Sequence, residues 1–251
     1  MKKNLATEPP EVNFSEEGLV RHLHLGSIWI QGSMRVDAPT VLVHEYVQRM
    51  MAWLLLVDPA TAPMRRALQL GLGAGSLSKF CALEVGIRST AIELNPQVLH
   101  ACRGWFALPT DHPRLHVVLA DAAQEICQPQ WQGSVDALQV DLYDQDAAAP
   151  VLDSPQFYAH CRSTLTSDGC MTVNLFGRSS SFERSLERIA SAFGGEAIWA
   201  FKATRQGNTV VLAQRTPTRP PRATWAARGD YIEEQWGLPA RQWVRVLKPV
   251  A

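Results

Sequence analysis

Three glycines at alternate positions mark the stretch of the sequence with the clearest chemical meaning. Gly71, Gly73 and Gly75 follow an apolar run at 66–70, and apolar residues with roughly helical spacing come next. Glycine suits such a turn because a Cβ would block positive φ and hold a ligand away from the backbone. The helix behind the turn would point its amide dipoles at a bound group. The pattern predicts a ligand-binding turn between a strand and a helix.

An acidic residue follows this turn at the distance that nucleoside recognition requires. Glu93 lies 22 positions after Gly71, at the end of a second apolar run. In a βαβ unit an acid at about this spacing accepts hydrogen bonds from two ribose hydroxyls. A surface glutamate after an ordinary βα turn is the alternative, but the spacing and the order both match the nucleoside pattern. We therefore expect Glu93 to bind a ribose.

Two further strand-like runs also end in a carboxylate. Asp121 follows the run at 115–120, and Asp141 follows the run at 137–140. Ligands of open α/β sheets bind outside the carboxyl ends of the strands. Each aspartate alone is typical of a solvated loop. Three acids at successive strand ends together favour a cationic ligand that carries a nucleoside.

The elements around these residues predict an α/β fold. Strands are expected at 66–70, 89–93, 115–120, 137–140 and 170–175, with helices at 96–105, 157–165 and 180–193 and a last pair of strands at 197–203 and 208–214. This alternation is typical of a Rossmann-like, mostly parallel sheet with an antiparallel terminal hairpin. We assign residues 61–215 to this nucleoside-binding domain.

The flanking segments are expected to be smaller. Residues 1–60 would hold a loose arm at 1–17, short strands within 19–36 and a helix at 41–57, with a linker at 58–63. The strands of this β-rich segment should cover the nucleotide end of the main domain, because Gln31 is polar in an otherwise apolar stretch. Residues 216–251 would form a linker and a pair of helices.

Composition excludes several classes of function. The 251 residues carry a formal net charge of zero, which argues against a nucleic-acid scaffold. No apolar run is long enough for a transmembrane helix. The five cysteines form no C-x-x-C pair, which favours free thiols in a reducing cytoplasm. The histidines suggest no metal site, and His22 and His24 are expected at the surface.

The glycine spacing distinguishes the turn from a dinucleotide-binding one. A G-x-G-x-x-G turn would need glycine at position 76, where the chain has Ser76. A nicotinamide-dependent dehydrogenase is therefore disfavoured. The G-x-G-x-G spacing resembles that of class I S-adenosylmethionine-dependent transferases, whose sheet also ends in an antiparallel hairpin.

More specifically, residues 28–214 resemble the spermidine/spermine synthase family. The family carries a glutamine before its catalytic domain, a glycine turn, an acid after the next strand, and an Asp-small pair beside the adenine. The resemblance implies that the donor nucleoside is held by the matching positions of this chain, which are Gln31, Gly71, Gly73, Gly75, Glu93, Asp121 and Ala122.

The resemblance also implies a catalytic residue and an acceptor site. The family has a strand ending in D-x-x-D, which matches Asp141-Leu142-Tyr143-Asp144. It implies Asp141 as the base that takes the proton of the attacking amine, with Asp144 and Tyr143 in the polyamine site. A Tyr-His-Glu segment of the family corresponds, in a shifted register, to His44-Glu45-Tyr46, and would place Glu45 on a distal ammonium group.

The implied reaction moves an aminopropyl group from a decarboxylated S-adenosylmethionine donor to a polyamine, with no metal. A homodimer is compatible with this resemblance. One departure keeps the donor open: Ala74 stands where the family turn usually has the aspartate that holds the donor amine. The family's Gly-Pro-containing gate segment after D-x-x-D is also missing, and residues 145–150 stand in its place. A small-molecule methyltransferase that uses S-adenosylmethionine itself, and a non-catalytic nucleoside-binding homologue, therefore stay as alternatives.

Overall fold

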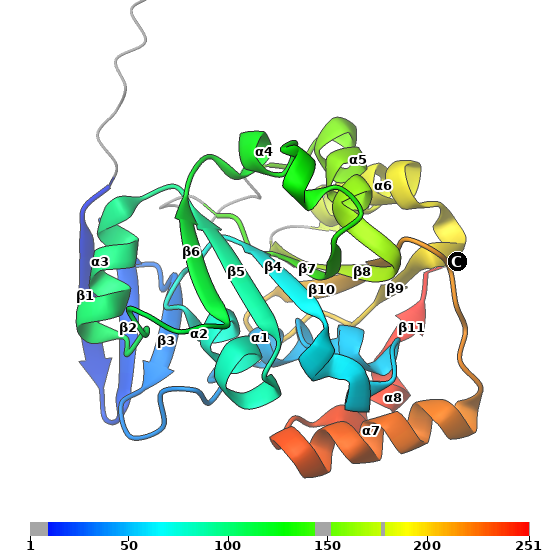
Figure 1. Cartoon of the computed structure of the whole chain (residues 1–251), viewed down its shortest axis with the longest axis horizontal. Coiled ribbons are helices and arrows are strands. Elements are labelled where there is room, and N and C mark those ends of the chain that lie inside the picture. The colour runs from blue at the N-terminus through cyan, green and yellow to red at the C-terminus, as the bar shows by residue number, and fades with distance from the viewer. Residues whose placement is uncertain (1–9, 144–151, 177–178, 251) are drawn as a thin grey trace, which may run out of the picture.

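The computed structural model describes residues 10–143, 152–176 and 179–250, and its centre is an eight-stranded sheet in the order β11-β9-β10-β8-β7-β4-β5-β6 (Figure 1). The pairs from β8 to β6 are parallel, and those from β8 to β11 are antiparallel. The predicted Rossmann-like sheet with an antiparallel terminal hairpin is therefore confirmed. The strand bounds are β4 Arg66–Leu70, β5 Arg88–Glu93, β6 Leu115–Leu119, β7 Val135–Val140, β8 Leu165–Phe176, β9 Ile198–Ala200, β10 Asn208–Gln214 and β11 Lys248–Pro249.

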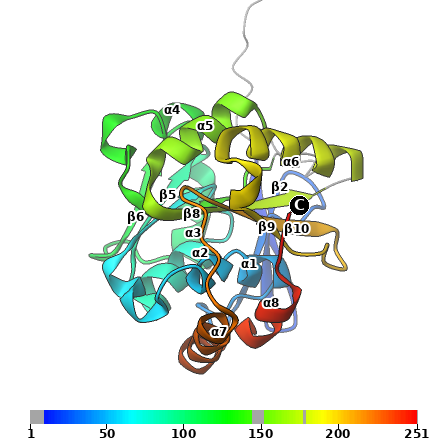
Figure 2. The same cartoon turned by 90° about the vertical axis from the view of Figure 1, so that its right-hand side faces the viewer.

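Helices cover both faces of this sheet (Figures 1 and 2). One face carries α4 (Ala122–Glu125), α5 (Pro155–Thr164) and α6 (Ser179–Phe193). The other carries α1 (Glu45–Arg49), α2 (Ser76–Lys79), α7 (Arg222–Trp236) and α8 (Ala240–Val246). Shorter helical turns complete the cover: η1 Ala52–Leu55, η2 Pro59–Met64, η3 Phe80–Val85, η4 Pro129–Trp131 and η5 Gly195–Ala197.

A smaller antiparallel sheet lies at one end of the molecule, in the order β1-β2-β3. Its strands are β1 Val12–Glu17, β2 Val20–Leu25 and β3 Gly32–Arg35, and α3 (Pro96–Trp105) packs between it and β5. The predicted strands within 19–36 are confirmed. The loose arm expected at 1–17 is wrong for residues 12–17, because β1 pairs with β2 along its whole length. Its side chains are almost all exposed, so no buried alternation marks it in the sequence.

The predicted helix at 41–57 is broken in the structure. It forms the short α1 and then the 3-10 turn η1, because residues 50–57 are buried on every side rather than along one face. The predicted linker at 58–63 is also wrong. These residues form η2, whose first turn is capped by Asp58 accepting from the Ala60 amide at 3.1 Å, and Ala62 is fully buried.

The remaining differences are small. The strand predicted at 170–175 is longer in the structure, because β8 starts at Leu165 and shifts register against β7. The two-residue strand β11 pairs with β9 and has no sequence signal. None of the five cysteines forms a disulfide, as predicted. Within the described residues, no helix combines the length and the apolar character needed to cross a bilayer.

Candidate active site

The glycine turn after β4 adopts the left-handed backbone that its composition predicts. Gly71, Gly73 and Gly75 have φ values of 91°, 51° and 68°, and Gly75 is the N-cap of α2. A Cβ on Gly71 would collide with the backbone oxygen of Asp141, so glycine is required where the ends of β4 and β7 meet. Gly71 and Gly73 line a cavity of about 1090 Å³, whereas Gly75 does not.

The small N-terminal sheet covers this turn, as predicted. A Cβ on Gly32 would lie 2.6 Å from the backbone nitrogen of Ala74, so β3 approaches as closely as backbone allows. The Ser76 hydroxyl donates to the Ser33 carbonyl oxygen at 3.0 Å and ties α2 to the same strand. Gln31, at the start of this contact, lines the cavity.

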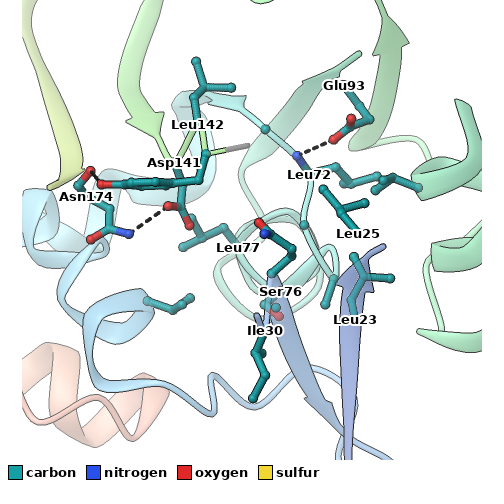
Figure 3. A pocket seen from close by; sticks show the side chains of 18 of the residues that line it. Leu23, Leu25, Ile30, Leu72, Ser76, Leu77, Glu93, Asp141, Leu142 and Asn174 are labelled. Carbon is teal, nitrogen blue, oxygen red and sulfur yellow. Dashed lines mark hydrogen bonds between the residues drawn. The ribbon is translucent and has the colours of Figure 1, made fainter. Parts of the chain in front are cut away.

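Glu93 links the end of β5 to the glycine turn. Its Oε2 accepts from the Leu72 amide at 3.0 Å and its Oε1 accepts from the Asn95 amide at 2.8 Å. Burial raises the pKa of Glu93. A carboxylate oxygen has two lone pairs, so both oxygens can still accept a hydroxyl. Figure 3 shows Glu93 and Asp141 on either side of the cavity.

Asp121 caps the next element along the sheet. Its Oδ1 accepts from the amides of Ala123 and Gln124 at 2.8 and 3.3 Å, which starts α4 directly after β6. Asp121 and the buried Ala122 both line the cavity. Because both bonds go to Oδ1, Asp121 can present Oδ2 to a ligand.

Asp141 directly follows β7, across the cavity from Glu93, where the side chains of Asn174 and Asn208 also line the cavity (the polar end). Its Oδ1 accepts from the Asn174 amide nitrogen at 2.9 Å (Figure 3), and the Tyr46 hydroxyl is also hydrogen-bonded to it. Burial raises the pKa of Asp141 to about 6, although both hydrogen bonds lower it. The carboxylate is therefore ionised at neutral pH and has a raised proton affinity.

Amides and aromatic rings surround Asp141 at the polar end. Tyr143 donates its hydroxyl to the Asn174 carbonyl oxygen at 2.9 Å, and its ring meets Phe176 edge to face at 6.5 Å. Asn208 donates its side-chain amide to Asn174 Oδ1 at 3.2 Å. Burial raises the pKa of Tyr143, so its hydroxyl keeps its proton.

Of the other predicted acceptor residues, Glu45 is not brought into this arrangement, and Asp144 lies outside the described residues. Glu45 is exposed on α1, outside the residues that line the cavity, and its carboxylate accepts from Arg49 Nη2 at 2.5 Å. Among the residues that the structure describes, no cluster of three acidic, histidine or cysteine side chains could hold a metal ion.

No protein-family model matches the chain. A polyamine aminopropyltransferase from Neisseria meningitidis serogroup A is 34% identical over 241 residues, which cover 95% of this chain and 89% of the relative. Another from Chromobacterium violaceum is 35% identical over 243 residues, with coverages of 95% and 90%. The chain belongs to the polyamine aminopropyltransferase family.

Solved structures agree on the fold of this polyamine aminopropyltransferase family member. A probable spermidine synthase from Corynebacterium glutamicum superposes with a TM-score of 0.73 at 20% identity, covering 93% of this chain and 88% of that one. Human Methyltransferase-like protein 13 in complex with SAH gives a TM-score of 0.69 at 20% identity, with coverages of 78% and 93%. The spermidine synthase of Thermotoga maritima gives 0.59 at 15% identity, with coverages of 90% and 88%.

Several residues at or beside the cavity of this family member are not predicted from the sequence. Asn174 is 3% exposed inside the apolar strand β8, and a polar residue in such a run is the signal that could have found it. His44 and Tyr46 line the cavity rather than Glu45 between them. His22, expected at the surface, is half-buried against Ser33.

Proposed function

We propose that the protein transfers an aminopropyl group from decarboxylated S-adenosylmethionine to an amine of a polyamine. The observation that carries the proposal is Asp141, a carboxylate of raised proton affinity between a nucleoside-type end and a polar end of one cavity. The match covers 89–90% of the length of the relatives named for this activity, which supports the same reaction here.

The reaction balances with the groups of this cavity. The nitrogen lone pair of the acceptor amine attacks the aminopropyl carbon next to the sulfonium, the C–S bond breaks, and its electron pair goes to sulfur as a neutral thioether. The proton leaves the new ammonium for Asp141. Because the leaving group is already good, the protein contributes mainly alignment and a base.

Most of the predicted residues that line the cavity have a proposed role in this reaction. Glu93 would accept the ribose hydroxyls, and Asp121 with Ala122 would border the adenine. Gln31 would close the nucleoside end from β3. The rings of Tyr143 and the neighbouring Phe176 would contact the methylene chain of the acceptor.

A second candidate, methyl transfer from intact S-adenosylmethionine, is favoured by one observation. Ala74 is 2% exposed and packs against Gly32, so the turn offers a donor ammonium no carboxylate. A donor whose tail carries its own carboxylate would lose less by this absence. The same nucleoside residues would then keep their roles, and Asp141 would orient the acceptor.

Calorimetry on the unmodified protein separates the donors. We expect decarboxylated S-adenosylmethionine to bind more tightly than the intact form, but by no more than about tenfold, or about 1.4 kcal/mol, because the turn lacks the paired acid. Methylthioadenosine gives the affinity of the nucleoside alone. A clear preference for the intact form would favour methyl transfer, and a preference of several orders of magnitude for the decarboxylated form would show that another acid replaces the missing one. An Ala74→Asp variant is less clean, because a larger side chain there would displace β3.

A further inference from the structure

Two histidines share one buried serine beside the cavity. Ser33 Oγ lies 2.7 Å from His22 Nδ1 and 2.7 Å from His44 Nε2. Ser33 is 2% exposed, and it lines the cavity together with His44. His22 and Ser33 are cross-strand partners in β2 and β3, so the small sheet fixes two of the three groups.

We propose that His22 and Ser33 are positioning residues, which hold the His44 ring in the cavity wall so that it orients an alkyl ammonium group of a substrate. This inference rests on the proposed function, because both proposed substrates carry such a group. The ammonium is that of the donor's aminopropyl chain or that of the acceptor, and the experiment distinguishes the two.

The hydroxyl of Ser33 restricts the proton arrangement of the three side chains. A hydroxyl donates one hydrogen bond and can accept two. Between two neutral imidazoles, one ring nitrogen must therefore donate to Oγ and the other must accept from it. The two hydrogen bonds thus couple the tautomer of His44 to that of His22, and in the arrangement in which His44 Nε2 donates to Oγ, its Nδ1 is unprotonated and can accept from an ammonium. With both rings protonated, Oγ would face two donors and its own proton would lose both partners.

The charges around His44 favour its neutral form. Burial lowers the pKa of His44, and the positive charge of His22 lowers it further. Among the described residues, the titratable side chains that face His44 are His22 from β2 and Tyr46 from α1, whose ring stacks at 5.9 Å, with Asp141 beyond Tyr46. Glu45 points to Arg49 instead. A neutral ring accepts a hydrogen bond from an ammonium, whereas an imidazolium would repel it.

Kinetics of serine variants test the proposal. Ser33→Ala should raise the KM of the ammonium substrate that His44 orients by about tenfold, with kcat nearly unchanged. The reason is that Ser33 no longer holds the His44 ring in place, which weakens the hydrogen bond from the charged ammonium to that ring. Ser33→Thr restores a hydroxyl and should restore the KM. Measuring donor and acceptor KM separately identifies the ammonium. Methylthioadenosine carries no ammonium, so its affinity should stay at the wild-type value.

The chain offers a matched control in the same small sheet. Ser15 Oγ lies 2.8 Å from His24 Nε2, an equivalent serine–histidine bond outside the cavity lining. Ser15→Ala should therefore leave both KM values unchanged. His22→Gln can still bond Ser33 but carries no charge, so the pKa of His44 should rise. In the wild type, KM should increase at low pH, where His44 becomes protonated and repels the ammonium. In His22→Gln this increase should begin at a higher pH.

Three results would overturn the proposal. They are wild-type KM values for Ser33→Ala, an equal loss of methylthioadenosine affinity in that variant, and an unshifted pH profile for His22→Gln. If the wild-type protein forms no aminopropylated product at all, the proposed function fails. If the wild type turns over and Ser33→Ala does so with the same KM, only the positioning role fails.

Discussion

Replacing Asp141 by asparagine is expected to lower kcat by about 100- to 10,000-fold, the usual contribution of a positioned general base. The attacking amine must be neutral, yet an alkyl amine has a pKa near 10. Asp141 is placed to accept its proton, since the carboxylate is bonded to Asn174 at 2.9 Å and to the Tyr46 hydroxyl. Asparagine can keep the bond to Asn174 but cannot take up a proton.

The pH dependence of kcat/KM provides the matching test. Because burial raises the pKa of Asp141 to about 6, the carboxylate is protonated below that pH and the rate should fall there. As the pH rises through about 6, the wild-type rate should rise, and Asp141→Asn should lose this limb. Asp168→Asn serves as the control, because Asp168 is exposed and paired with Arg65. It lies near the N-terminal end of β8, whereas Asn174, the partner of Asp141, lies near the C-terminal end. Full activity of Asp141→Asn at neutral pH would exclude a base at this position.

Replacing Glu93 by alanine is expected to weaken nucleoside binding by about 1.5–3 kcal/mol for each charged hydrogen bond lost. The two oxygens of Glu93 already hold the amides of Leu72 and Asn95, and their remaining lone pairs would accept the ribose hydroxyls. The variant therefore loses both the ligand bonds and a support of the glycine turn. Calorimetric titration with methylthioadenosine measures the combined loss.

Glu93→Gln separates these two contributions. It keeps one oxygen acceptor for the turn but removes the charge, so a smaller loss of affinity is expected than for alanine. Glu84→Gln is the control, because Glu84 is exposed on η3 and does not line the cavity. Unchanged affinity in a folded Glu93→Ala variant, judged by its melting temperature, would refute the ribose assignment.

The sequence predicted best the positions of the candidate site residues that stand at the end of a strand. Gly71, Glu93, Asp121 and Asp141 each stand at the end of a largely apolar run, and parallel strands bring such ends to one edge of the sheet. The local pattern therefore predicts both the strand and the place of its last polar residue. The fold class was predicted on the same basis, whereas the cover over the glycine turn was predicted from the polar Gln31 in an otherwise apolar stretch.

The missed features depend on tertiary contacts that no local pattern carries. Asn174 reaches Asp141 only because β8 lies beside β7 in one particular register. Tyr46 falls within the helix predicted at 41–57, but that helix breaks after Arg49, and Tyr46 lies in the cavity wall. β1 pairs through its backbone alone, so its exposed side chains resemble those of a loop.

The most direct measurement of the central claim is the mass of the products formed from decarboxylated S-adenosylmethionine and a diamine. We expect a triamine, heavier than the diamine by one aminopropyl group, and an equal amount of methylthioadenosine, both formed at least about 100-fold more slowly by Asp141→Asn. A parallel reaction with intact S-adenosylmethionine should give no methylated amine. A methylated amine from the intact donor, with no triamine from the decarboxylated one, would contradict the account.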